Sequence, residues 1–202
     1  MEKILEHEPS IEDESDKEVF QRYMEDLKLR PEDFEKKILD VGSGANKFAK
    51  WAKEHNVSSQ IYSLEPLRKS REVSKNVKGW AAAMPFQNES FDLVVSNGAI
   101  PNTLLAGDAE CLKERVKESL YEMLRVTKRG GEIRLGRVIK GDKDSPRGQL
   151  TPAIEETLEE MRSKHYVEIE EIHSPPDLCE YKNGKPAGLI ARVFLIKIRK
   201  PA

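Results

Sequence analysis

Apolar residues recur along the chain in two alternating patterns. Short continuous runs bounded by turn residues are typical of buried strands, whereas a period of three or four residues is typical of amphipathic helices. The runs predict strands near 37–41, 61–64, 77–83, 91–96, 132–139, 166–172 and 189–198. The longer period predicts helices around 19–27, 48–52, 66–75, 108–124 and 151–161, with Asp108 as a helix cap and Gly130-Gly131 as a helix stop.

Strands alternate with helices along almost the whole chain. Right-handed crossovers place each helix against the sheet between parallel strands, so the pattern predicts a mostly parallel sheet with helices on both faces. The last two strands are joined by a loop containing Asn183-Gly184 and no helix, so we expect an antiparallel last strand. The predicted fold is an α/β, doubly wound, three-layer Rossmann-like sandwich. We expect residues 1–16 to form an acidic flexible tail and residues 17–202 a single domain.

A glycine-rich turn follows the first predicted strand. The apolar run ends at Asp40-Val41, and Gly42-Ser43-Gly44 would let the backbone turn sharply and approach a ligand beyond the strand end. Such a turn suits a dinucleotide equally well by itself. However, Lys47 stands where the dinucleotide fingerprint requires a small residue, which disfavours a nicotinamide cofactor.

An acidic residue ends the second predicted strand. Glu65 lies about twenty residues after the glycine turn, where a carboxylate can accept hydrogen bonds from both hydroxyls of a ribose. A carboxylate just before Pro66 is equally suited to stabilise the N-terminus of a following helix. Position and residue type leave both roles open for Glu65.

Four separated motifs together resemble the class I S-adenosylmethionine-dependent methyltransferases, and in particular the small-molecule branch that includes the ubiquinone and menaquinone biosynthesis methyltransferases. The resemblance covers about 37–138. The motifs are Ile38-Leu39-Asp40-Val41-Gly42-Ser43-Gly44, Leu64-Glu65-Pro66, Met84-Pro85-Phe86 with 90–97, and Leu124-Arg125-Val126-Thr127-Lys128-Arg129-Gly130-Gly131.

The resemblance implies a seven-stranded sheet in the order 3-2-1-4-5-7-6. It also implies that S-adenosyl-L-methionine is the methyl donor, with S-adenosyl-L-homocysteine as product. Asp40 and the glycine turn would face the methionine end of the cofactor, and Glu65 the ribose. The cofactor-binding residues that it implies are Asp40, Gly42, Ser43, Gly44, Asn46, Glu65, Pro66, Ala81, Ala82, Met84 and Asn97.

The chain departs from the family pattern at several positions. Asn46 replaces a frequent third glycine, although Asn tolerates a left-handed backbone. Trp80-Ala81-Ala82 stands where relatives carry an acidic residue that holds the adenine amino group; we expect Trp80 in the core rather than stacked on adenine. Asn97-Gly98 is compatible with a methionine contact or with a simple turn. Ala99-Ile100 breaks the pattern of enzymes that methylate exocyclic amines, which disfavours nucleic-acid bases as acceptors.

Methyl transfer from a sulfonium is an in-line displacement that requires alignment and a dry site more than a particular catalytic side chain. If a general base is needed, the candidates are Glu171 and His173, although a strand-end histidine is more often structural. Substrate choice is expected in the connections 97–107, 140–150 and 174–188, whose basic middle segment would suit an anionic acceptor. The helix around Phe20 and Tyr23 could cover the cofactor or simply pack on the sheet.

Composition narrows the functional classes further. The net charge is −2 with acidic and basic residues interleaved, so neither nucleic acid nor a membrane surface is an expected partner. The 2 cysteines lack partners at zinc spacing, and no metal site is expected. Met1–Ser10 does not resemble a secretory signal, which favours a cytoplasmic location.

Two alternative functions stay open at this point, a noncatalytic S-adenosylmethionine-binding module and a nicotinamide-dependent oxidoreductase. A small-molecule substrate is favoured, in a monomer or homodimer. The sequence carries no signature of the methyl acceptor or of the pathway.

Overall fold

The computed structural model describes residues 14–58, 60–66, 75–102, 109–141, 150–172, 179–182, 185–189 and 191–202. Seven strands form a single sheet in the order β3-β2-β1-β4-β5-β9-β6, which confirms the predicted topology. Strands β1 to β5 are parallel to one another, while β9 runs antiparallel to both β5 and β6. Among the described residues, no helix is long and apolar enough to cross a membrane.

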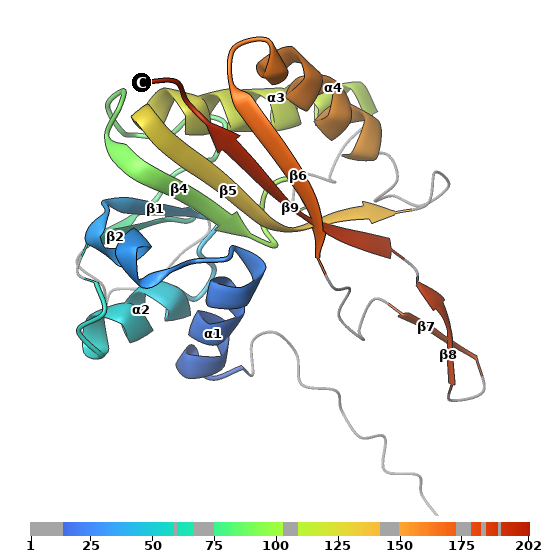
Figure 1. The fold of residues 1–202 in the computed structure, drawn as a ribbon, viewed down its shortest axis with the longest axis horizontal. Helices are drawn as coiled ribbons and strands as arrows, with labels where there is room; N and C mark the ends of the chain where they lie inside the picture. Colours follow the sequence, from blue (N-terminus) through green and yellow to red (C-terminus); the bar gives the residue numbers. More distant parts are fainter. Residues whose placement is uncertain are drawn as a thin grey trace, which may run out of the picture.

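The elements follow one another along the chain as a nearly regular alternation (Figure 1). The helices are α1 (Asp16–Asp26), the 3-10 helix η1 (Pro31–Glu35), α2 (Lys47–Glu54), α3 (Ala109–Val126) and α4 (Leu150–Arg162). The strands are β1 (Ile38–Val41), β2 (Ile61–Leu64), β3 (Asn76–Val77), β4 (Phe91–Asn97), β5 (Thr127–Gly141), β6 (Tyr166–Ile172), β7 (Cys179–Lys182), β8 (Lys185–Leu189) and β9 (Ala191–Arg199).

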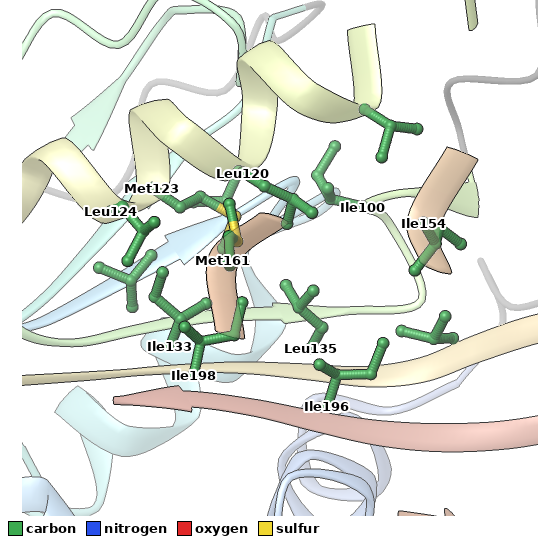
Figure 2. Close-up of a cluster of buried hydrophobic side chains, with 14 of the residues drawn as sticks. Ile100, Leu120, Met123, Leu124, Ile133, Leu135, Ile154, Met161, Ile196 and Ile198 are labelled. Carbon is green, nitrogen blue, oxygen red and sulfur yellow. The ribbon is translucent and has the colours of Figure 1, made fainter. Parts of the chain in front are cut away.

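Helices cover both faces of the sheet, α3 and α4 on one side and α1 and α2 on the other (Figure 1). The α3–α4 side buries a purely apolar cluster in which Leu120, Met123 and Met161 meet Ile133, Leu135, Ile196 and Ile198 of the sheet (Figure 2). On the other side, aromatic rings of α1 and α2 pack together, with Tyr23 stacked on Phe48 at a centroid distance of 4.3 Å. Burial of these two faces is the main source of stability of the layered fold.

The structure differs from the sequence prediction at three places. The third strand comprises only Asn76–Val77, because the chain turns at 80–83, where Ala83 N–H donates to Trp80 O at 3.1 Å. Helix α3 ends at Val126 and β5 begins at the next residue, so Gly130-Gly131 lies inside a strand rather than ending a helix. The connection between β6 and β9 contains the antiparallel pair β7–β8, which the sequence pattern did not reveal.

Some predictions fall on residues that lie outside the described part of the chain. They concern the tail before residue 14, the helix expected from Pro66 to Lys75, the cap at Asp108 and the turn at Asn183-Gly184.

Helix α1 is held at both ends. Ser15 and Glu18 form a reciprocal capping box at its start. Beyond its end, Arg134 of β5 donates to Lys28 O at 3.1 Å and to Asp33 Oδ2 at 2.9 Å. Asp33 is fully buried and Arg134 only 5% exposed. This buried ion pair fastens the segment after α1 to the middle of the sheet.

Candidate functional site

The glycine turn lies at the carboxyl end of β1, where the strand leaves the sheet. Gly42 has a φ of 75° and Gly44 a φ of 50°, both in the left-handed region that favours glycine. A Cβ at Gly42 would overlap Ala99 Cβ, so the β4–α3 connection packs directly on the turn. A Cβ at Gly44 would meet nothing within 4 Å, which leaves open space beside the backbone. The turn is thus tight on one side and accessible on the other.

The residue that replaces the third glycine adopts the conformation expected of it. Asn46 has a φ of 60° and is fully buried at the start of α2. Its Oδ1 accepts a hydrogen bond from Ser63 Oγ, whereas its Nδ2 has no partner among the described residues. Ser43 Oγ is likewise buried without a partner in the described structure. Two unsatisfied polar atoms at a glycine turn are what a polar ligand could satisfy.

Glu65 stands one residue past β2, beside the glycine turn. Its Oε2 accepts a hydrogen bond of 3.1 Å from the N–H of Gly44, and its own N–H donates to Val77 O at 3.2 Å. The glycine turn and the Glu65 carboxylate therefore share one place at the carboxyl edge. Pro66 follows at a bend, and residues 67–74, where the alternative role of Glu65 expects a helix, lie outside the described part of the chain. We call residues 42–46 together with Glu65 the glycine-turn site.

Asp40 lies under this site and is held by the α1 helix. The carboxylate is fully buried in β1 and accepts a hydrogen bond of 3.2 Å from Tyr23 Oη. Burial, the negative charge of Asp40 and this hydrogen bond raise the pKa of Tyr23 well above its usual value, so the hydroxyl stays protonated as a donor. The sequence placed Tyr23 on the inner face of a helix but did not predict this contact.

The loop after β3 carries three of the cofactor-binding residues that the resemblance implies, Ala81, Ala82 and Met84, and is clamped by α3. Met84 N–H donates to Glu122 Oε2 at 2.8 Å, and Arg125 donates to Met84 O at 3.0 Å and to Phe86 O at 2.8 Å. Met84 is buried in the core, and Ala81 packs partly against it. Ala82 is half-buried in the same turn.

Trp80 contradicts our expectation that it belongs to the core. The side chain is 64% exposed, the largest value among the large apolar residues described. The short third strand explains the difference, since the chain has already left the sheet at Val77 and turns at Trp80–Ala83.

Asn97 ends β4 and connects the sheet to α1. Its Nδ2 donates to Asp26 Oδ2 at 2.9 Å, and its Oδ1 is buried without a partner in the described part of the chain. Burial raises the pKa of the Asp26 carboxyl, and the Asn97 hydrogen bond together with the positive charges of Arg137 and Arg22 offsets this only in part. Asn97 is therefore more than a turn residue, because it fixes a half-buried carboxylate at the carboxyl edge.

A groove of about 480 Å³ opens between α1 and the carboxyl ends of β5 and β6. We call it the α1 groove, and seven of its eight lining residues carry a charge. The lining residues are Arg22, Glu25, Asp26, Lys28, Arg137, Glu170, Glu171 and Ile172.

The structure describes only one of the two candidate bases, Glu171. Glu171 lines the α1 groove, is exposed and forms an ion pair with Arg192. A hydrogen bond from Arg192 lowers the pKa of Glu171, so the carboxylate is a weaker base than an ordinary glutamate. His173 lies outside the described residues. The sequence did not single out Asp26, the carboxylate that burial makes more basic, because its neighbours Asn97 and Arg137 are far from it along the chain.

Comparison with known proteins is consistent with this geometry. Residues 39–135 match a family described as a methyltransferase domain. That segment begins inside β1 and ends inside β5, so it includes the glycine turn, Glu65 and Asn97. No curated protein is detectably similar to the chain in sequence.

Several solved structures share the fold at low sequence identity. The YcgJ protein of Bacillus subtilis is 13% identical with a TM-score of 0.54, over 92% of this chain and 100% of that one. An S-adenosylmethionine-dependent methyltransferase of Archaeoglobus fulgidus is 14% identical with a TM-score of 0.55, over 92% of this chain and 95% of that one. A methyltransferase described in complex with the Trm112 activator of Haloferax volcanii is 14% identical with a TM-score of 0.56, over 93% and 94%.

The matched segment contains in full three of the four motifs on which the resemblance rests, and the fold has the predicted strand order. These two observations support the same assignment. The chain therefore carries a methyltransferase domain over residues 39–135 and shares the fold of the S-adenosylmethionine-dependent methyltransferases.

Proposed function

We propose that the protein transfers the methyl group of S-adenosylmethionine to a small-molecule acceptor and binds the cofactor at the glycine-turn site. The observation that carries this proposal is the pairing of Gly44 N–H with the Glu65 carboxylate beside two buried polar atoms without partners, Ser43 Oγ and Asn46 Nδ2. The open space beside Gly44 is the second support.

The residues present fit the cofactor in chemical terms. A ribose offers hydroxyl donors to the Glu65 carboxylate, and a methionine carboxylate can accept from Ser43 Oγ and from Asn46 Nδ2. The half-buried turn at Ala81 and Ala82, clamped through Met84, offers a fixed apolar wall for the adenine ring. When bound, the cofactor supplies an electrophilic methyl group on a positively charged sulfur.

The chain's own contribution to the reaction is to position the acceptor. Asn97, beside the glycine turn along the sheet edge, holds Asp26 toward the α1 groove. Helix α1 therefore connects the two regions, since Tyr23 binds Asp40 and Asp26, one helical turn further on, binds Asn97. We propose that the acceptor enters through the α1 groove.

The variant Glu65→Ala tests the cofactor site. Loss of a carboxylate that accepts two charge-assisted hydrogen bonds, each worth roughly 1.5 to 3 kcal/mol, should lower the affinity for S-adenosylhomocysteine at least about tenfold. Calorimetric titration measures the affinity, and urea unfolding without ligand measures the stability. Glu54→Ala, on the exposed end of α2, is a matched carboxylate control.

If Glu65 serves only to stabilise the N-terminus of a helix, the variant should lose about 0.3 to 1 kcal/mol of stability and keep its affinity. That result would remove Glu65 from the cofactor site. Failure of S-adenosylhomocysteine to raise the thermal midpoint of the wild-type protein at any accessible concentration would remove the cofactor assignment itself.

A further inference from the structure

The α1 groove differs from an ordinary solvated surface because its shape depends on features that are costly to build. Arg137 has a φ of 50°, a left-handed conformation that non-glycine residues rarely adopt. It lies where the β5–β9 register shifts between Leu135 and Val138. Strained backbone of this kind persists only where surrounding contacts impose it, and it is concentrated at functional sites.

Asn102 imposes the conformation of Arg137. Its Nδ2 donates to Arg137 O at 2.7 Å and to Gly98 O at 3.2 Å, while its Oδ1 accepts from Ile139 N–H at 3.2 Å. A single side chain thus holds the backbone of Arg137 and of Ile139 and joins it to the connection after β4. The left-handed conformation of Arg137 is therefore held by contacts with a distant part of the chain.

The opposite wall of the groove is pressed onto the sheet at a glycine. A Cβ at Gly136 would lie 2.8 Å from Asn97 Oδ1 and 2.9 Å from Leu27 Cδ2, so a larger residue would displace the ends of these two side chains, and glycine lets α1 lie this close to β4 and β5. The close approach brings Asp26 within reach of Asn97 and leaves its carboxylate half-buried beside the groove.

The charges around the groove define the ligand that it suits. Ligand pockets are mostly apolar, but here only Ile172 is uncharged, which indicates a small and strongly polar ligand. Lys28 is paired with Glu170, Arg22 with Glu14 and Glu171 with Arg192. Asp26 and Arg137 place opposite charges within one groove, and the charge of Arg137 acts on the Asp26 carboxyl.

We propose that the α1 groove binds a small zwitterion that carries an ammonium and a carboxylate, with Asp26 accepting from the ammonium and Arg137 facing the carboxylate. The volume of about 480 Å³ accommodates a free amino-carboxylate of a few carbon atoms. The proposal rests on the proposed function in one respect, since the α1 groove is the entrance that the proposed function assigns to the acceptor.

The test compares three probes of equal length on the full chain saturated with S-adenosylhomocysteine. They are 4-aminobutyrate, butylamine, which lacks the carboxylate, and butyrate, which lacks the ammonium. Affinities and binding positions come from amide chemical shifts in a nuclear magnetic resonance titration. We expect 4-aminobutyrate to bind at least about tenfold more tightly than either singly charged probe and to shift residues of the α1 groove.

Two variants, each of which removes one charge, show which end of the ligand Asp26 and Arg137 bind. Asp26→Asn keeps an oxygen for Asn97 and should weaken 4-aminobutyrate and butylamine at least about tenfold but leave butyrate unchanged. Arg137→Asn, chosen because Asn tolerates the left-handed backbone, should weaken 4-aminobutyrate and butyrate but leave butylamine unchanged. Lys113→Gln removes a cation from the distant α3–α4 surface and should change none of the three.

The proposal is overturned if the three probes bind equally to the wild-type protein, or if the shifts lie outside the groove. It is also overturned if S-adenosylhomocysteine binds while no amino-carboxylate from glycine to 5-aminopentanoate does. Failure of S-adenosylhomocysteine to bind would instead contradict the proposed function, so the two failures are distinguishable. The probe comparison on the wild-type protein needs no variant and therefore does not depend on how the variants fold.

Discussion

At the carboxyl edge of the sheet, the glycine-turn site and the α1 groove differ in what fixes their shape. The glycine-turn site is contained in two short segments, and its form follows from backbone conformation at Gly42, Gly44 and Asn46. The α1 groove takes its residues from α1, β5 and β6, and its form follows from side chains that meet across more than a hundred positions of sequence. The first is therefore a local structure with a recognisable motif, whereas the second exists only once the layers have packed.

The largest effect is expected at Gly42. Gly42→Ala adds a Cβ that overlaps Ala99 and places alanine in a left-handed conformation, which together should cost about 2 to 5 kcal/mol of stability. Urea unfolding measures the loss. Gly44→Ala, which has the strained φ but open space, should lose only about 1 to 2 kcal/mol.

A second variant isolates the steric part of this loss. Adding Ala99→Gly to Gly42→Ala removes the overlap and should recover the steric part of the lost stability. The loss caused by the left-handed conformation of residue 42 should persist. Equal losses for the two glycine variants would mean that Ala99 does not shape the turn.

The next largest effect is expected at the buried ion pair of Asp33 and Arg134, which fastens the segment after α1 to the sheet. Asp33→Leu removes one of the two carboxylates that pair with the buried Arg134 and should cost about 3 kcal/mol, at the low end for a broken buried pair because Glu132 also holds Arg134. The double variant Asp33→Leu with Arg134→Met should recover much of the loss. Lys113→Gln, which breaks an exposed pair, should cost about 1 kcal/mol or less. Comparable losses for the buried and exposed pairs would contradict the role given to Arg134.

A smaller loss is expected at the contact between α1 and the sheet. Gly136→Ala should cost about 1 to 3 kcal/mol, because the added methyl group crowds Asn97 and Leu27. Affinity for S-adenosylhomocysteine should change little, since the glycine-turn site is formed elsewhere. If affinity fell as strongly as in Glu65→Ala, the two regions would be one site and the distinction between them would fail.

The smallest effect is the pH dependence contributed by Asp26. Its carboxyl has a raised pKa, so the folded state binds this proton more tightly than the unfolded state does. The resulting stability is present below the ordinary aspartate pKa of about 3.9 and is lost as pH rises through the higher folded value. As the pH rises from about 3.9 through the higher pKa of folded Asp26, the Asp26→Asn variant should therefore gain stability relative to wild type. Urea unfolding at a series of pH values measures this gain. The opposite trend would show that Arg22, Arg137 and Asn97 outweigh burial.

Local sequence determined the alternation of elements, the strand order through its family resemblance, and the position of the glycine turn with its left-handed Asn46. The alternation and the glycine turn depend on periodicity and on backbone preference, which act over a few residues, whereas the strand order came only from the resemblance. Local patterns misplaced the end of α3 and the length of β3, because pairing with neighbouring strands extends β5 back to Thr127 and stops β3 at Val77.

Only the tertiary structure decided which charged residues face one another. Asp26 and Arg137 look like surface residues in sequence, as do dozens of other charges, and their proximity follows from the packing of α1 on the sheet at Gly136. The exposure of Trp80 was decided in the same way, by where the chain leaves the sheet. The physical reason is that burial and long-range pairing, unlike backbone preference, are properties of the packed layers and not of any short segment.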